Sequence, residues 1–292
     1  MTRAQAALDA LRRELVPASP TADLDAQLLL AHVLGIDRAR LAADPARPLD
    51  AAQVDTLVAL ARRRLGGEPI AYLTGKREFW SLDLEVTPDV LVPRPETELV
   101  VELALAELSA MQSPAVLDLG TGSGAIALAI ASERQDAAVT AVDASAAALA
   151  LARRNAARLG IGNVRFLTGS WYEAVGGAHF DVIVSNPPYV AIGDPALAAL
   201  LHEPRAALVA GVDGLDALRA ICAGAPARLV AGGVLIVEHG ATQGAAVRAL
   251  MAQSGLTGAT THRDLAGHER ATRGISAPSA LQSGSGNGEI PQ

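Results

Sequence analysis

The regular alternation of short apolar runs with helical stretches, from about residue 115 onward, constrains the fold more than any other feature of this chain. The apolar runs predict strands at 115–119, 138–142, 163–167, 180–185 and 233–238. The stretches between and after them predict helices at 125–133, 145–159, 214–230 and 242–254. Apolar, β-branched strands that alternate with helices form a parallel sheet covered on both faces. The predicted fold class is therefore α/β, and after His262 the pattern weakens to short extended pieces.

The segment ahead of this alternation predicts two further parts. In residues 1–66, apolar side chains recur at helical spacing on three stretches, and a pair of glycines ends the last one. We expect a small N-terminal helical bundle there, which docks a substrate protein. Residues 67–94 contain Leu82, Leu84 and Val86 in alternation with polar residues, the period-two pattern of a half-buried strand. They predict a β-hairpin connector.

The sheet with its helices is then expected over residues 95–276. Residues 277–292 are rich in Ser, Gly and Pro without any periodicity, so they predict a disordered tail.

Composition and charge exclude several classes of protein. The lone cysteine, Cys222, cannot form an internal disulfide, and the six histidines show no metal-ligand spacing, so no metal is expected. No apolar run is long enough to cross a bilayer and no secretory signal is visible, which predicts a cytoplasmic protein without a membrane partner. A net charge of −7 argues against direct binding of nucleic acid.

A glycine-rich loop follows the first predicted strand of the sheet and leads into a helix. It consists of Gly120, Thr121, Gly122, Ser123 and Gly124. Glycines at such a turn let the backbone bend sharply and let a ligand approach closely. Asp143 ends the second strand, where a carboxylate can accept hydrogen bonds from ribose hydroxyls. The combination predicts a nucleoside-cofactor site.

The loop alone does not choose between a dehydrogenase and a methyltransferase, because it also satisfies the loose dinucleotide pattern. Asp118 favours a methyltransferase. A carboxylate just before the loop would sit poorly against a pyrophosphate, but it suits the cationic amino-acid end of S-adenosylmethionine.

The fourth strand ends in the tetrapeptide Asn186, Pro187, Pro188 and Tyr189. Ligands of open α/β sheets bind beyond the carboxyl ends of the strands, so the tetrapeptide is expected to face the cofactor crevice. The prolines fix the backbone, and an amino group can donate to the Asn186 side chain and to the Pro187 carbonyl. Tyr189 can form a flat wall for a planar amide or base. We interpret the four residues as catalytic and substrate-binding.

This combination of glycine loop and tetrapeptide resembles the amino-methylating S-adenosylmethionine-dependent methyltransferases, over residues 115–275. The resemblance implies a Rossmann-like class I methyltransferase sheet with helices on both faces. The stretches 67–80 and 90–98, with the later His202-Glu203-Pro204-Arg205 and His268-Glu269-Arg270, resemble the bacterial release-factor glutamine methyltransferases, the HemK/PrmC family. That resemblance spans nearly the whole chain.

The family resemblance implies a reaction and assigns roles. The expected activity is methyl transfer from S-adenosylmethionine to the side-chain amide nitrogen (N5) of the glutamine in the Gly-Gly-Gln motif of peptide-chain release factors. The residues that resemble its cofactor site are Gly120, Thr121, Gly122, Ser123, Gly124, Asp143, Trp171 and Asn186. Arg94 and Glu98 are expected at the entrance to that site. The chain departs from the family at Ser170, where an acidic residue is usual.

Two other functions remain open from the residues. An adenine-N6 methyltransferase acting on DNA or RNA would use the same tetrapeptide on a flipped base, but it should carry a basic face. A non-catalytic binding protein on a decayed methyltransferase fold would not need an intact loop and tetrapeptide.

Overall fold

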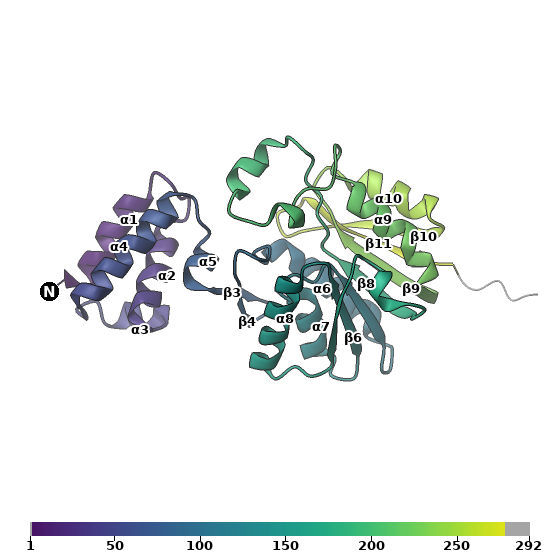
Figure 1. Ribbon diagram of the computed structural model, residues 1–292, viewed down its shortest axis with the longest axis horizontal. Helices are drawn as coiled ribbons and strands as arrows, with labels where there is room; N and C mark the ends of the chain where they lie inside the picture. The colour runs from purple at the N-terminus through teal and green to yellow at the C-terminus, as the bar shows by residue number, and fades with distance from the viewer. Residues whose placement is uncertain (1, 278–292) are drawn as a thin grey trace, which may run out of the picture.

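The computed structural model describes residues 2–277, and it contains a helical region joined by a connector to a larger region built on a sheet (Figure 1). The prediction of a disordered tail falls, apart from Ala277, outside the described residues. No helix of the described part is long and apolar enough to cross a membrane.

The helical region, residues 4–74, has its own apolar core. Its helices are α1 (Ala4–Leu15), α2 (Ala22–Leu34), α3 (Arg38–Ala43), α4 (Ala51–Leu65) and α5 (Ile70–Thr74). A two-residue pairing of β1 (Thr2–Arg3) with β2 (Pro48–Leu49) closes one end. The three predicted helices are confirmed as α1, α2 and α4, whereas the short α3 and α5 were not predicted. The buried leucines are Leu8, Leu11, Leu15, Leu29, Leu30, Leu34, Leu41, Leu49, Leu57, Leu60 and Leu73.

Helix α4 shows how the local sequence sets an element's bounds. The Asp50 side chain accepts a hydrogen bond from the Gln53 backbone N–H, and the Gln53 side chain accepts one from the Asp50 backbone N–H. This reciprocal capping satisfies two N–H groups that a helix start leaves free. Three arginines occupy the last turn, where cations suit the helix dipole, and Gly66 follows.

The connector holds the predicted hairpin. Strands β3 (Lys76–Phe79) and β4 (Leu82–Glu85) pair antiparallel across a two-residue turn. Trp80 and Ser81 form that turn with φ values of 52° and 58°, the left-handed conformation that tight hairpins require. Phe79 and Leu84 are buried in the same apolar cluster as the sheet, so the connector packs on the sheet region.

A seven-stranded sheet forms the centre of the sheet region, in the order β10-β11-β9-β8-β5-β6-β7. Strands β5 (Ala115–Leu119), β6 (Ala138–Asp143), β7 (Val164–Thr168), β8 (Phe180–Ser185) and β9 (Leu229–Glu238) run parallel. Strands β10 (Leu256–Arg263) and β11 (Glu269–Ser276) are antiparallel additions at one edge. The α/β prediction is confirmed.

Helices cover both faces of this sheet (Figure 1). The cluster on one face includes residues of α6 (Glu98–Leu108), α7 (Ala125–Glu133) and α8 (Ala146–Leu159). The other face carries α9 (Asp216–Gly224) and α10 (Gly244–Gln253). Short 3-10 turns lie at η1 (Pro95–Thr97), η2 (Glu173–Val175), η3 (Pro195–Leu200), η4 (Arg205–Ala207) and η5 (Ala225–Ala227).

Two sequence predictions were wrong in extent. The predicted helix 214–230 ends at Gly224, because Pro226 has no N–H to continue it, and β9 already begins at Leu229. The short extended pieces expected after His262 form the eight-residue strand β11, and β10, which ends at Arg263, was not predicted.

Candidate functional site

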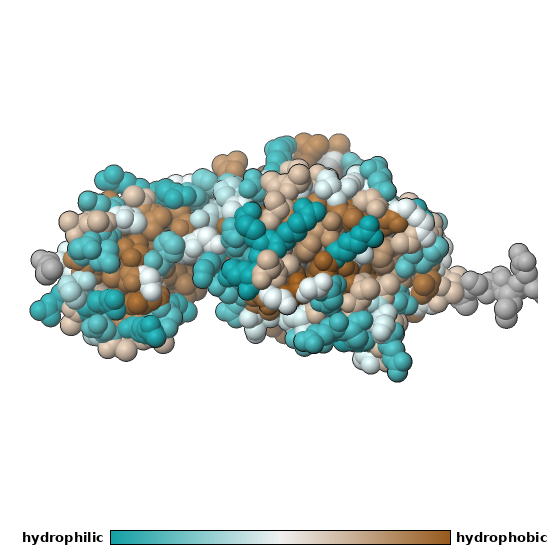
Figure 2. Space-filling view, turned by 60° about the horizontal axis from the view of Figure 1, so that its bottom comes forward, coloured by the Kyte–Doolittle hydropathy of each residue, from teal (hydrophilic) through white to brown (hydrophobic). Residues whose placement is uncertain are grey.

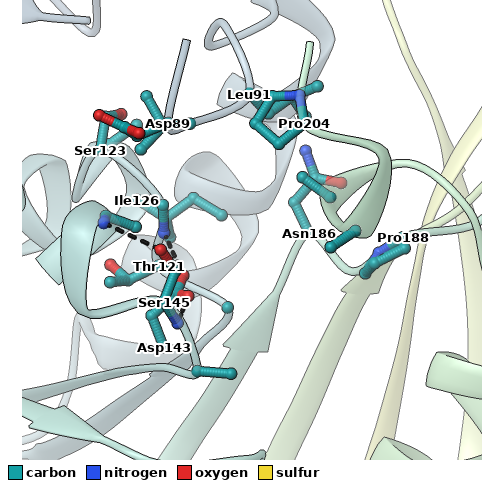
Figure 3. A pocket seen from close by; sticks show the side chains of 18 of the residues that line it. Asp89, Leu91, Thr121, Ser123, Ile126, Asp143, Ser145, Asn186, Pro188 and Pro204 are labelled. Atoms are coloured by element: carbon teal, nitrogen blue, oxygen red, sulfur yellow. Dashed lines mark hydrogen bonds between the residues drawn. The ribbon is translucent and has the colours of Figure 1, made fainter. Parts of the chain in front are cut away.

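A cavity of about 350 Å³ lies at the carboxyl ends of β5, β6 and β8. Strand β5 has β6 on one side and β8 on the other, so the chain leaves this edge in two directions, which is where open α/β sheets bind ligands. Figure 3 shows Asp143 and Ser145 at one side of the cavity and Asn186 and Pro188 at the other, with Leu91 and Pro204 above. The volume suits a small-molecule site.

The glycine loop lies against this cavity in a conformation that requires glycine. Gly120, Gly122 and Gly124 have φ values of 73°, 56° and 87°. A Cβ at Gly124 would lie 3.0 Å from a Leu128 methyl group and 3.2 Å from Ala152 Cβ, so the third glycine lets α7 pack closely on α8. Gly120, Thr121, Gly122 and Ser123 line the cavity, whereas Gly124 does not.

Asp143 joins the loop to the end of β6. Its Oδ2 accepts a hydrogen bond from the Gly122 N–H at 2.9 Å, and its Oδ1 accepts one from the Ser145 N–H at 2.8 Å. Asp143 also lines the cavity. Each carboxylate oxygen keeps a second lone pair, so the side chain can still accept hydrogen bonds from a ligand.

Asp118 is fully buried beneath the loop. Its Oδ2 accepts hydrogen bonds from the Thr121 hydroxyl at 2.6 Å and from the Ala127 N–H at 3.2 Å. Its Oδ1 has no hydrogen-bond partner among residues 2–277. Burial raises the pKa of Asp118 to about 7, and the nearby Asp143 adds to that effect.

Asn186 lies at the end of β8 and lines the cavity with Pro188. Its Nδ2 donates a hydrogen bond to the Thr97 hydroxyl at 3.0 Å. Pro187 and Tyr189 do not line the cavity. Tyr189 packs against the core, and its hydroxyl donates to Glu238 Oε1 at 3.1 Å. The ring of Tyr189 therefore does not supply the flat cavity wall that the sequence predicted.

Trp171 and Ser170 form another part of the cavity lining. Trp171 has a φ of 47°, which is uncommon for a residue with a side chain. A Cβ on Gly120 would lie 3.7 Å from the Trp171 ring, so the indole faces the glycine loop. Ser170 stands at the position expected for an acidic residue, and it offers a hydroxyl.

Arg94 and Glu98 do not line the cavity, although their neighbours Pro93 and Thr97 do, so their place at its entrance stays a prediction. Arg94 forms an ion pair with the buried Glu203, whose Oε2 also accepts the Val92 N–H at 3.0 Å. Glu98 accepts the Trp80 N–H at 2.9 Å. Both side chains hold separate segments of the chain together. A charged residue that is flanked by prolines and lies next to a hairpin can stabilise the packing of the hairpin as well as bind a ligand.

Several residues of the site were missed from the sequence. Asp89, Leu91, Thr97, Ser145 and Pro204 line the cavity; Leu91, Thr97 and Pro204 lie in stretches that carry the family resemblance, but no role at the site was assigned to them. Asn155 is fully buried and accepts the Glu85 N–H at 2.7 Å, while its Nδ2 donates to the Glu85 and Ser123 carbonyls at 3.0 Å. For Asn155, the sequence offered one signal of a structural role, which is an isolated asparagine in the middle of a predicted helix.

Acidic, histidine and cysteine side chains form no group that could hold a metal ion within the described part of the chain. The polar groups that face the cavity are carboxylate, amide and hydroxyl groups around a largely apolar wall. Such a lining fits a nucleoside and a planar amide better than a phosphate, because no arginine or lysine lines it.

Two solved structures share the fold. A methyltransferase from Pyrococcus furiosus gives a TM-score of 0.51 at 20% identity, covering 74% of this chain and 97% of that one. A 16S rRNA N2 G1207 methyltransferase from T. Thermophilus, in complex with AdoMet and guanosine, gives 0.54 at 21% identity, covering 69% of this chain and 49% of that one. At these identities the similarity shows the fold alone.

Sequence comparison is more specific. Residues 6–75 match the family model described as PrmC N-terminal domain, and residues 99–214 match the one described as Methyltransferase small domain. A release factor glutamine methyltransferase from Burkholderia pseudomallei is 53% identical over 89% of this chain and 94% of its own length. One from Pseudomonas aeruginosa is 50% identical over 90% of this chain and 96% of its own length. The chain therefore belongs to the family of release factor glutamine methyltransferases.

Proposed function

We propose that this protein transfers a methyl group from S-adenosylmethionine to the side-chain amide nitrogen of a glutamine in peptide-chain release factors, at their Gly-Gly-Gln motif. The observation that carries the proposal is the position of Asn186, which lines the same cavity as Asp143 and the glycine loop. An amide-binding group thus faces a nucleoside-binding group, in a chain whose relatives are release factor glutamine methyltransferases.

The lining fits S-adenosylmethionine on two grounds. Asp143 can accept hydrogen bonds from ribose hydroxyls, and the apolar side chains of Leu91, Ile126 and Trp171 give walls for a purine. Asp118 does not line the cavity, but it lies directly beneath the loop with one buried oxygen that has no partner within residues 2–277, and a cationic amino group near the loop would favour its charged form. When bound, S-adenosylmethionine would supply an electrophilic methyl carbon, whose S–C bond breaks as the new N–C bond forms, which leaves S-adenosylhomocysteine as the product. No metal is needed for this proposal.

The chain's own contribution is positioning. Asn186 has its Nδ2 engaged with Thr97, so its Oδ1 is the atom that can accept one N–H of the glutamine amide. In this proposal the Pro187 carbonyl accepts the other once a substrate is bound, although Pro187 does not line the cavity in this structure. An amide held by both hydrogens cannot rotate, and its nitrogen is aimed at one point, which lowers the entropic part of the barrier. The departing proton can leave after transfer.

We also propose a division of labour along the chain. Residues 1–66 would dock the protein substrate, 67–94 would join the two parts, and 95–276 would carry the transfer. Release factors take part in translation, so the proposal predicts a cytoplasmic protein without direct contact to nucleic acid. Short Gly-Gly-Gln peptides should be poor substrates, because they cannot reach residues 1–66.

Mass spectrometry of a release factor before and after incubation with the enzyme and S-adenosylmethionine tests the proposal. We expect one added methyl group of about 14 mass units, located on the glutamine. A release factor in which that glutamine is changed to asparagine is the control, and it should gain nothing. DNA or RNA methylated at adenine while the release factor stays unmodified would show that the nucleic-acid alternative is correct.

A further inference from the structure

We infer that Thr97 and Glu238 are positioning residues for this reaction, because together they fix which way the Asn186 amide faces. They would keep its oxygen, and not its NH2 group, directed at the substrate amide. The inference rests on the proposed function, since it concerns how the acceptor amide is held.

The three side chains come from separate elements that meet at one wall of the cavity, which Asn186 and Thr97 line. Asn186 follows β8, Glu238 ends β9, and Thr97 ends η1. Thr97 is 3% exposed, and its backbone N–H donates to the Arg94 carbonyl at 3.1 Å. Its hydroxyl oxygen accepts from Asn186 Nδ2 at 3.0 Å. Thr97 is therefore a fixed contact of Asn186.

Glu238 is a buried acceptor beside the same hydroxyl. It is 1% exposed, and its Oε1 accepts from the Tyr189 hydroxyl. Its Oε2 has no well-formed hydrogen bond within residues 2–277. Burial raises the pKa of Glu238 to about 7, while the hydroxyls of Thr97 and Tyr189 favour the charged form, as donors do. No well-formed hydrogen bond joins Thr97 to Glu238 within residues 2–277, so the free Oε2 is the acceptor to which, in this inference, the Thr97 proton turns.

The direction of the chain follows from the number of protons. A threonine hydroxyl has one proton to donate. When that proton is directed at the Glu238 carboxylate, the Thr97 oxygen can only accept from Asn186, so the Asn186 NH2 group is committed to Thr97. If the Asn186 side-chain amide were turned by 180°, its NH2 group would face the NH2 group of the substrate amide. Two donors cannot form a hydrogen bond with each other. Glu238 also holds Tyr189, so it supports both ends of the tetrapeptide.

Three variants test this inference in the full-length enzyme. Thr97→Val keeps the shape and removes the hydroxyl, and we expect its kcat on a release factor to fall about 100-fold. KM and the dissociation constant of S-adenosylmethionine, measured by calorimetry, should stay near wild-type values. Thr97→Ser restores the hydroxyl and should return kcat close to wild type. Glu238→Gln replaces an acceptor by a donor and should also lower kcat.

Thr272→Val is the matched control. Thr272 is fully buried in the same sheet, and its hydroxyl bonds His239 and Thr261. Within residues 2–277 this hydroxyl forms no hydrogen bond to the tetrapeptide, to Thr97 or to Glu238. It should lower the melting temperature without lowering kcat. The inference is overturned if Thr97→Val keeps the wild-type kcat, if Thr97→Ser is as slow as Thr97→Val, or if Thr272→Val is equally slow. A wild-type enzyme that leaves the release factor unmodified would instead overturn the proposed function.

Discussion

Asp25 in the helical region is held differently from two buried carboxyl groups of the sheet region, Asp118 and Glu238. In the helical region, Asp25 is 4% exposed and fully engaged. It accepts hydrogen bonds from Ser19 at 2.7 Å, from Thr21 at 3.0 Å and from the Arg64 guanidinium at 2.7 Å. These hydrogen bonds satisfy the Asp25 carboxylate and pair its charge with Arg64. They therefore join α2 to α4 without leaving a buried charge unpaired.

The sheet region does the opposite at Asp118 and Glu238. Within the described residues neither forms an ion pair, and each leaves one oxygen without a partner. Both have pKa values raised to about 7 by burial. Such groups cost stability, and they are typical of functional sites. Figure 2 shows the two regions as separate bulks joined by a narrower neck, so this contrast falls between two distinct bodies.

The largest effect that we expect separates activity from stability within the sheet region. Asn186→Ala should lower the rate of methyl transfer about 1,000-fold, because orientation of the acceptor is worth several kcal/mol of barrier. S-adenosylmethionine should still bind, as calorimetry would show. Near-normal rates in this variant would remove Asn186 from the mechanism.

Asn186→Asp sharpens the same point. The carboxylate still accepts a hydrogen bond, but its charge attracts the cationic sulfonium before transfer and loses that attraction as the charge disappears. We expect cofactor binding at least as tight as wild type together with slower turnover. Faster turnover would contradict the argument.

In the helical region, the expected effect is on stability alone. Arg64→Ala leaves Asp25 buried without its cation, and breaking such a pair should cost about 3 kcal/mol in the free energy of unfolding. Affinity for S-adenosylmethionine should not change. Lys76→Ala is the matched control, because Lys76 pairs with Asp83 at 2.9 Å while 62% exposed, and it should cost less than about 1 kcal/mol. Chemical denaturation measures both.

Asp143→Ala should weaken S-adenosylmethionine binding by about 1.5–3 kcal/mol, the range for hydrogen bonds to a charged group. The same substitution frees the N–H groups of Gly122 and Ser145, so a melting curve must accompany the calorimetry. A folded variant with unchanged affinity would exclude Asp143 from the cofactor site.

The last effect concerns the pH dependence of stability. The pKa of Asp118 is about 7 in the folded protein, above its usual value of 3.8, so the folded state binds more protons than the unfolded state between these values. Wild type therefore loses stability from this group as the pH rises toward 7. Asp118→Asn does not titrate, and this group should change the free energy of unfolding of wild type by roughly 2–3 kcal/mol between pH 5 and pH 8, so the melting temperature of the variant relative to wild type should rise by about 5–10 °C over that range. The histidines titrate in both proteins, so their contributions to the difference in melting temperature cancel. A difference in melting temperature that stays constant with pH would contradict the raised pKa of Asp118.

Much of the fold could be predicted because local patterns and tertiary structure agree. The strands 115–119 and 180–185 and the helix 125–133 have the predicted bounds. Strand β10 was missed because it lies at the edge of the sheet, where one side needs no apolar residues and Thr and Gly suffice. Its sequence therefore lacks a strong strand pattern.

The site was predictable only where a motif marks it. The glycine loop, Asp143 and Asn186 belong to recognisable patterns, and the cavity brings them together. Thr97 and Glu238 meet Asn186 only because η1 and β9 are adjacent to the end of β8 in space. No spacing along the chain indicates such a meeting, so residues that act through long-range packing stay hidden in a single sequence.

The contacts of the connector also decide how the chain can be re-engineered. His202 Nε2 lies 3.0 Å from the Gly66 carbonyl, Glu203 binds the Val92 N–H, and Asn155 ties Glu85 to the glycine loop. A chimaera that exchanges helices α1 to α4 for another docking module would have to keep residues 66–94 together with the sheet region. A junction placed before Gly66 keeps these contacts. A junction placed after Val92 would remove both the contact of Glu203 with the segment above the cavity and the contact that supports the glycine loop.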